Sequence, residues 1–151
     1  MIRSLHKEDI DRVAAIWLES NIKTHDFIPQ AYWERHFIPV KEQLTQAELY
    51  VYEDEKNIQG FIGLEGDYIA GIFVSENSRS RGIGKALMDH VKAKNTKLRL
   101  NVYQKNGRAL RFYQREGFRI WRERYDEAVG EKEYEMRWET LMPARAQNDR
   151  P

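Results

Sequence analysis

The sequence predicts a mixed α/β fold in a single domain. Apolar residues alternate with polar ones in several short runs and recur at helical spacing in others, so strands and helices are interleaved along the chain. Three strand-like runs also follow one another directly in the middle of the chain. At 151 residues the chain has the length of one ordinary domain, which buries roughly two-thirds of its unfolded surface.

The first third of the chain predicts one strand and two helices. "MIRSL" alternates and indicates a strand, and Asp9 to Asn21 carries one apolar stripe at helical spacing. Pro29 suits the start of a second helix, roughly Gln30 to Thr45, and Pro39 is expected to break that helix in two.

Strands dominate the middle of the chain. "ELYVYEDEKNIQGFIGLEGDYIAGIFV" predicts three consecutive strands, with turns at "EDEKN" and "EGD". A helix follows, and its expected buried stripe is Ile83, Leu87 and Val91.

The last third predicts a strand, a helix and a closing hairpin. "KLRLNVY" places Leu98, Leu100 and Val102 on one face, and a helix from Gly107 to Glu116 is expected to stop at Gly117. "FRIWRERY" and "EKEYEMRW" are interpreted as an antiparallel pair joined through "DEAVGE". The polar segment 140–151 lacks periodicity and is predicted to be a disordered tail after a domain at 1–139.

Composition narrows the possible chemistry. There is no cysteine, which excludes disulfides, zinc–thiolate sites and a cysteine nucleophile. The four histidines are scattered and none pairs with a nearby acid at helical spacing, so no metal site is expected. Without a long apolar run or a signal-peptide pattern, we expect a cytoplasmic protein with no membrane contact.

Charge is unevenly distributed along the chain. The net charge is +1, yet the segment from Arg79 to Arg115 holds eleven Lys and Arg side chains against one acid, Asp89. Such a segment indicates an anionic ligand, and solvated helix faces are the alternative interpretation.

The stretch "SRSRGIGKAL" lies between a predicted strand and a predicted helix. It lacks the Ser or Thr that a P-loop needs after Lys85, and Leu87 replaces the third glycine of a dinucleotide fingerprint. What remains is Arg79-x-x-Gly82-x-Gly84 at a helix start, where backbone N–H groups and the helix dipole favour a pyrophosphate. An ordinary glycine turn is the alternative.

Two stretches carry a family resemblance. "IFVSENSRSRGIGKAL" resembles motif A of the GNAT superfamily of acyl-CoA N-acyltransferases, and "NGRALRFYQREGF" resembles its motif B. Residues 1–138 are similar to small bacterial members in element order as well. The resemblance implies a GNAT acetyltransferase domain at 1–139. It also implies a mostly antiparallel sheet, flanked by helices, that splays between its fourth and fifth strands, here Tyr68–Val74 and Lys97–Tyr103.

The resemblance further implies acetyl-CoA as co-substrate. The glycine loop would wrap its pyrophosphate, one strand would pair with the pantetheine arm, and Asn106 would hydrogen-bond near that arm, besides serving as a helix N-cap. The implied cofactor-binding residues are Ile72, Phe73, Val74, Arg79, Ser80, Arg81, Gly82, Ile83, Gly84, Lys85 and Asn106.

The resemblance gives Tyr113 the role of general acid toward the leaving thiolate, and a packed core tyrosine is the alternative. Asn101 stands where some members place a glutamate base, and an amide cannot take a proton. His25, Glu65, Asp67 or a water chain ending on one of them are the remaining candidates. If His25 is the base, kcat/KM should fall at low pH with a group near 6.5.

The amine acceptor is expected between the end of the first helix and the last hairpin. Phe27, Glu131 and Glu133 are the candidate substrate residues, because acids at the mouth would attract a cationic amine. Protein lysine, a protein N-terminus, a polyamine, an aminoglycoside and a small amine all remain open. We expect direct transfer to the amine in a monomer or homodimer, without a nucleic-acid partner. The alternative is a non-catalytic coenzyme A-binding sensor or assembly domain.

Overall fold

A computed structural model describes residues 1–55, 57–79 and 81–140. The chain divides into two compact units, Met1–Met88 and Asp89–Pro151. Its helices and strands follow the predicted order, with two short 3₁₀ helices added, η1 (Lys7–Asp9) and η2 (Glu76–Ser78). The mixed α/β prediction is confirmed.

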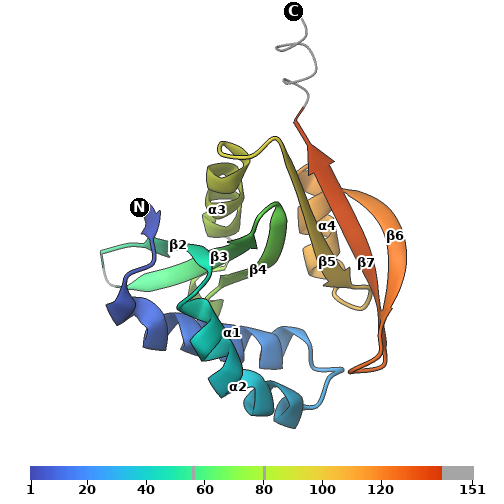
Figure 1. Cartoon of the computed structure of the whole chain (residues 1–151), viewed down its shortest axis with the longest axis horizontal. Coiled ribbons are helices and arrows are strands. Elements are labelled where there is room, and N and C mark those ends of the chain that lie inside the picture. Colours follow the sequence, from blue (N-terminus) through green and yellow to red (C-terminus); the bar gives the residue numbers. More distant parts are fainter. Residues whose placement is uncertain (56, 80, 141–151) are drawn as a thin grey trace, which may run out of the picture. The chain divides into compact units, whose positions relative to one another are not determined.

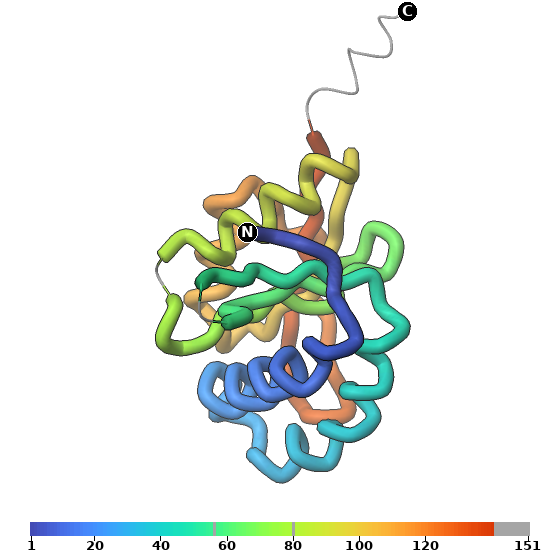
Figure 2. The backbone as a smooth tube through the Cα atoms, turned by 90° about the vertical axis from the view of Figure 1, so that its left-hand side faces the viewer, coloured from blue at the N-terminus to red at the C-terminus, as the bar shows by residue number. Residues whose placement is uncertain are grey.

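The first unit is an antiparallel sheet with two helices on one side (Figure 1, Figure 2). Its strands are ordered β1-β2-β3-β4 and every pair is antiparallel. The strands are β1 (Ile2–Ser4), β2 (Glu48–Glu53), β3 (Ile58–Glu65) and β4 (Tyr68–Val74), and the helices are α1 (Ile10–Thr24) and α2 (Gln30–Leu44).

The core of this unit forms where the apolar stripe of α1 meets the inward faces of β2 and β3. Val13 and Ile16 are almost fully buried and share one cluster with Leu49, Val51 and Phe61. Each such side chain contributes about 1.5–3 kcal/mol by leaving water. This packing fixes α1, whose C-terminal end carries the candidate residue His25.

The predicted break at Pro39 is wrong, because α2 runs through it as one helix. Proline removes one backbone donor, which leaves the carbonyl of Arg35 without its helical partner. Both Pro39 and Arg35 are exposed, so this carbonyl lies on the side of the helix that water reaches. Buried Trp33 and Leu44 hold the helix on either side of the proline.

The second unit has three antiparallel strands in the order β5-β7-β6. They are β5 (Lys97–Tyr103), β6 (Arg119–Asp126) and β7 (Glu131–Glu139), accompanied by α4 (Gly107–Arg115). Helix α3 (Ile83–Lys92) crosses the boundary between the units.

The predicted patterns of this half are confirmed. The side chains of β5 alternate, with Leu98, Leu100 and Val102 buried. Gly117 adopts a φ of +94° directly after α4, the left-handed conformation that ends a helix. The predicted splay concerns β4 and β5, which belong to different units, and it stays a prediction. The predicted tail falls, apart from Thr140, outside the described residues.

Candidate active site

The glycine loop connects β4 to α3 in the first unit. Ser78 anchors its start, because the side chain is buried and its hydroxyl donates to Gln59 Oε1 at 2.7 Å. Gly82 has a φ of +81°, which lets the chain turn into α3, and its carbonyl accepts from Ala86 N at 3.0 Å. Ser80, one of the predicted loop residues, lies outside the described residues.

This loop has the space and the charge that an anionic group needs. A Cβ placed at Gly82 would meet no heavy atom of the described residues within 4 Å, its chain neighbours aside, so the backbone there is open to approach. Arg81 and Lys85 are exposed on either side of Gly82, while Ile83 is buried and fixes the helix start beneath them. Gly84 lies in the first turn of α3, where N–H groups lack helical partners. The loop therefore fits a pyrophosphate.

The predicted pantetheine strand is the end of β4, residues 72–74. On one edge it pairs with β3, where Ile72 lies opposite Ile62 and Val74 opposite Gly60. The ring of Phe73 covers Gly71 so closely that a Cβ there would lie 2.4 Å from it. The missing side chain at Gly71 thus leaves the space that the Phe73 ring occupies.

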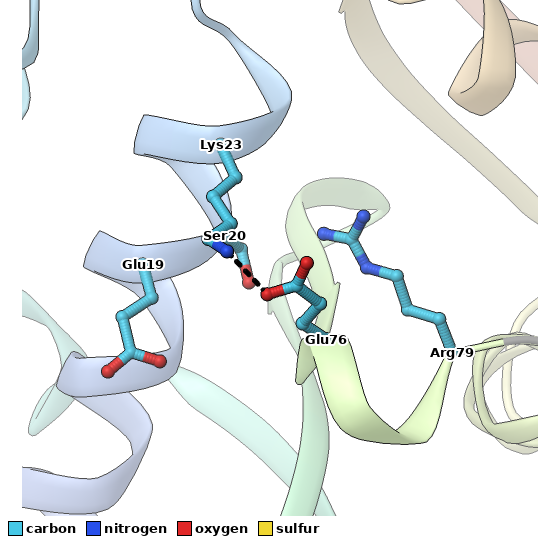
Figure 3. Close-up of a pocket in the computed structure, with 5 residues that line it drawn as sticks. All are labelled: Glu19, Ser20, Lys23, Glu76 and Arg79. Carbon is cyan, nitrogen blue, oxygen red and sulfur yellow. Dashed lines mark hydrogen bonds and ion pairs between the residues drawn. The ribbon is translucent and has the colours of Figure 1, made fainter.

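Arg79 points back toward α1 across a pocket of about 190 Å³ (Figure 3). Its guanidinium donates to Thr24 Oγ1 at 3.2 Å. Lys23 and Glu76 form an ion pair at 2.6 Å beside it, and the hydrogen bond from Lys23 lowers the pKa of Glu76. Arg79 therefore ties the glycine loop to the end of α1.

His25 is the C-cap of α1 and belongs to an aromatic cluster. Its ring stacks on Trp33 with centroids 5.6 Å apart and meets the Phe27 ring edge-on at the same centroid distance. The structure thus brings together two of the predicted site residues, His25 and Phe27.

Burial lowers the pKa of His25 to about 4, although neighbouring Asp26 acts in the opposite direction. The expected group near pH 6.5 is therefore wrong for this histidine. His25 stays neutral around pH 7.

Motif B lies in the second unit. Asn106 is the N-cap of α4 and its Oδ1 accepts from Ala109 N at 3.2 Å, which confirms the capping prediction. Tyr113, on the same helix, is 9 % exposed and packs beside Phe112 and Phe118 at ring distances of 5.5 and 5.9 Å. His25 and Tyr113 belong to different units.

Two of the predicted acids on β7 already have partners within the chain. Lys105 Nζ lies 3.2 Å from Glu131, and Arg124 Nε lies 3.4 Å from Glu133. The Glu131 and Glu133 side chains are only 14 % and 12 % exposed. Burial raises the pKa of Glu133, which favours its protonated form more than in water.

Other candidate bases have little geometric support. Glu65 is an exposed residue at the end of β3, and Asp67 lies in the turn that follows. Asn101 on β5 is paired in register with Glu135 of β7. Arg122 and Arg137 hold that carboxylate at 2.8 and 2.9 Å, which lowers its pKa despite its burial.

Sequence reasoning did not find several of these contacts. The hydrogen bond between Arg79 and Thr24 joins residues 55 positions apart, and no local sequence pattern predicts it. Buried Asn21, which contacts His25, was also missed. The predicted helix stopped at Asn21, whereas α1 continues for one more turn and so brings Asn21 next to His25, four residues further along.

Neither a metal-binding cluster nor a membrane-spanning helix is present in the described part of the chain. It contains no group of three or more His, Cys, Asp or Glu side chains placed to hold a metal ion. None of its helices is long and apolar enough to span a membrane.

Comparison with known proteins decides the family. Residues 45–120, half of the chain, match the acetyltransferase (GNAT) domain family. The chain belongs to the GNAT family. This acetyltransferase is 40 % identical over 123 residues to "Peptidyl-lysine N-acetyltransferase YiaC" of Escherichia coli (strain K12), covering 80 % of the chain and 84 % of the relative.

Further relatives agree with this placement of the acetyltransferase. It is 34 % identical over 119 residues to "Peptidyl-lysine N-acetyltransferase YjaB" of Salmonella typhimurium, covering 78 % of the chain and 81 % of the relative. The solution structure of apo YjaB from Escherichia coli matches with a TM-score of 0.82 at 27 % identity, over 91 % of this chain and 96 % of that one. The GNAT fold and an N-acetyltransferase activity are thereby confirmed, and these relatives lend no support to a non-catalytic domain.

Proposed function

We propose that this acetyltransferase moves an acetyl group from acetyl-CoA to the side-chain amine of a protein lysine. The observation that carries the proposal is the 40 % identity to a peptidyl-lysine N-acetyltransferase over four-fifths of the chain. We also propose a cytoplasmic location and a monomer or homodimer, as expected from the sequence.

In this proposal, most of the residues that hold acetyl-CoA belong to the first unit. The backbone at Gly82 and Gly84, with the cations of Arg81 and Lys85, binds the pyrophosphate. Ser80 and Ile83 complete that loop, and Arg79 anchors it through Thr24. Ile72, Phe73 and Val74 offer backbone groups to the amides of pantetheine, and Asn106 bonds near the same arm.

The transfer is direct, since the chain has no cysteine to carry the acetyl group. The lysine nitrogen attacks the thioester carbonyl, an N–C bond forms and the C–S bond breaks. The amine gives up one proton to water, the departing thiolate gains one from the Tyr113 phenol, and the tyrosinate is reprotonated from water. Neutral His25 accepts a hydrogen bond from the amine, and Phe27, Glu131 and Glu133 contribute to acceptor binding.

An acceptor screen tests the proposal. The full chain is incubated with acetyl-CoA and a panel of lysine peptides, N-terminal peptides, polyamines, aminoglycosides and small amines, while released thiol is measured. Thiol release that is fastest with lysine peptides supports the proposal. Release that requires a different amine class overturns the acceptor assignment. Binding of acetyl-CoA without release in any arm favours the sensor alternative.

A further inference from the structure

We propose that Asn21 is a positioning residue, which fixes His25 as the Nδ1–H tautomer and so presents Nε2 as a hydrogen-bond acceptor for the incoming amine. The tautomer follows from the geometry of α1 alone. The role toward the amine rests on the proposed function.

The orientation of the Asn21 amide is determined by its backbone partner. Asn21 lies in the last turn of α1 and is 3 % exposed. Its Nδ2 donates to the carbonyl of Trp17 at 2.9 Å. Turning the amide over would set two oxygen atoms against each other at that distance, with no hydrogen between them. Oδ1 therefore faces His25.

This orientation decides which nitrogen of His25 carries the proton. Nδ1 lies 2.9 Å from Asn21 Oδ1, and an amide oxygen only accepts. Nδ1 must then donate, and in a neutral imidazole the other nitrogen, Nε2, carries the lone pair. A backbone hydrogen bond joins the same two residues, because His25 N donates to Asn21 O at 2.9 Å. Asn21 thus holds both the ring and the main chain of His25.

The surroundings of the ring keep it neutral. Trp33 stacks on one side and Phe27 meets it edge-on, so the charged imidazolium loses hydration that these rings do not replace. Asp26 is the acid that favours a positive charge here, and burial outweighs it. A neutral ring with its lone pair at Nε2 attracts the N–H groups of an ammonium, whereas an imidazolium would repel them.

The tautomer is measured on the wild-type protein without any substrate. Long-range proton–nitrogen correlation spectra of histidine-labelled full-length chain at pH 7 distinguish a protonated from a bare ring nitrogen. His25→Gln assigns the signals of this ring among the four histidines. We expect a protonated Nδ1 and a bare Nε2. A protonated Nε2, or an even mixture of tautomers, overturns the proposal.

Asn21→Ala tests the positioning role, and Asn95→Ala is its matched control. Asn95 makes the same bond to the carbonyl four residues before it, that of Val91, at 2.8 Å, but contacts no histidine ring through it. Asn21→Ala should shift the His25 tautomer and raise KM for a lysine peptide about tenfold, in line with one hydrogen bond to a charged donor. KM for acetyl-CoA should stay the same. Asn95→Ala should change neither the tautomer nor the peptide KM.

The outcomes separate this inference from the proposed function. Thiol release by the wild-type enzyme with lysine peptides tests the function, and the spectra of His25 test the tautomer. If the predicted tautomer is found but a folded Asn21→Ala variant keeps its peptide KM, the role toward the amine is wrong. Circular dichroism establishes folding, and the wild-type spectrum decides the tautomer even if the variant does not fold.

Discussion

Gly82→Ala probes the phosphate loop through backbone conformation alone. A Cβ at this position has open space around it, so crowding plays no part. The φ of +81° is the obstacle, because an L-residue in the left-handed region costs about 1–2 kcal/mol. Gly82 is exposed, so the unliganded loop is expected to relax to a negative φ. Binding must then restore the original turn, which corresponds to a roughly 5- to 30-fold loss of affinity for acetyl-CoA.

Gly66→Ala is the matched control for this prediction. Gly66 has a φ of +63° and equally open space, but it lies in the tight turn between β3 and β4, next to the pair Glu65 and Tyr68. That pairing prevents relaxation, so the strain should lower the free energy of unfolding by about 1–2 kcal/mol and leave affinity unchanged. Calorimetric titration with acetyl-CoA and urea unfolding measure both quantities. Wild-type affinity in a folded Gly82→Ala variant would refute the assignment of this loop to the pyrophosphate.

Three further predictions concern the candidate catalytic and acceptor residues. Tyr113→Phe should lower kcat by about 10²–10⁴-fold with little change in the Kd of acetyl-CoA, and full activity in steady-state assays would remove the acid role. Glu131→Lys combined with Glu133→Lys should raise the amine KM roughly fivefold, about 1 kcal/mol of lost attraction, and leave KM for acetyl-CoA unchanged. The control variant Glu139→Lys should keep both KM values near wild type. An equal effect on both substrates would place the acceptor elsewhere. The unfolded chain protonates His25 near pH 6.5 and the folded chain near 4, so stability should fall as pH drops through that window, by up to roughly 3 kcal/mol. His25→Gln should flatten this part of the pH dependence of urea unfolding, and an unchanged slope would show that the ring is not buried in a neutral state.

Local patterns predicted the parts of the fold that local physics determines. The alternation of β5, the cap at Asn106 and the stop at Gly117 each depend on neighbours within a few residues, and all three were correct. Pro39 shows the limit of such rules. The cost of a proline in a helix is local, but the burial of Trp33 and Leu44 that offsets it is not.

The candidate site divides in the same way. The position of the glycine loop between a strand and a helix could be predicted, because its glycines and its basic side chains lie within seven consecutive residues. The ion pair of Glu133 with Arg124 depends on the register of the β6–β7 hairpin. The bond from Arg79 to Thr24 depends on how segments 55 residues apart come together. The neutral state of His25 has the same origin, since the rings that bury it come from α2 and from the connection between the helices.

The central claim, direct transfer of an acetyl group to a lysine side chain, is tested by mass spectrometry of a single turnover. Enzyme in excess over acetyl-CoA is mixed with a lysine peptide, and the acetyl content of peptide and intact enzyme is followed together with free thiol. Direct transfer predicts one acetyl-lysine for each thiol released and no acetylated enzyme when the peptide is left out. Thiol release without acetylated peptide, or an acetyl-enzyme that forms first and then transfers its acetyl group, would contradict it.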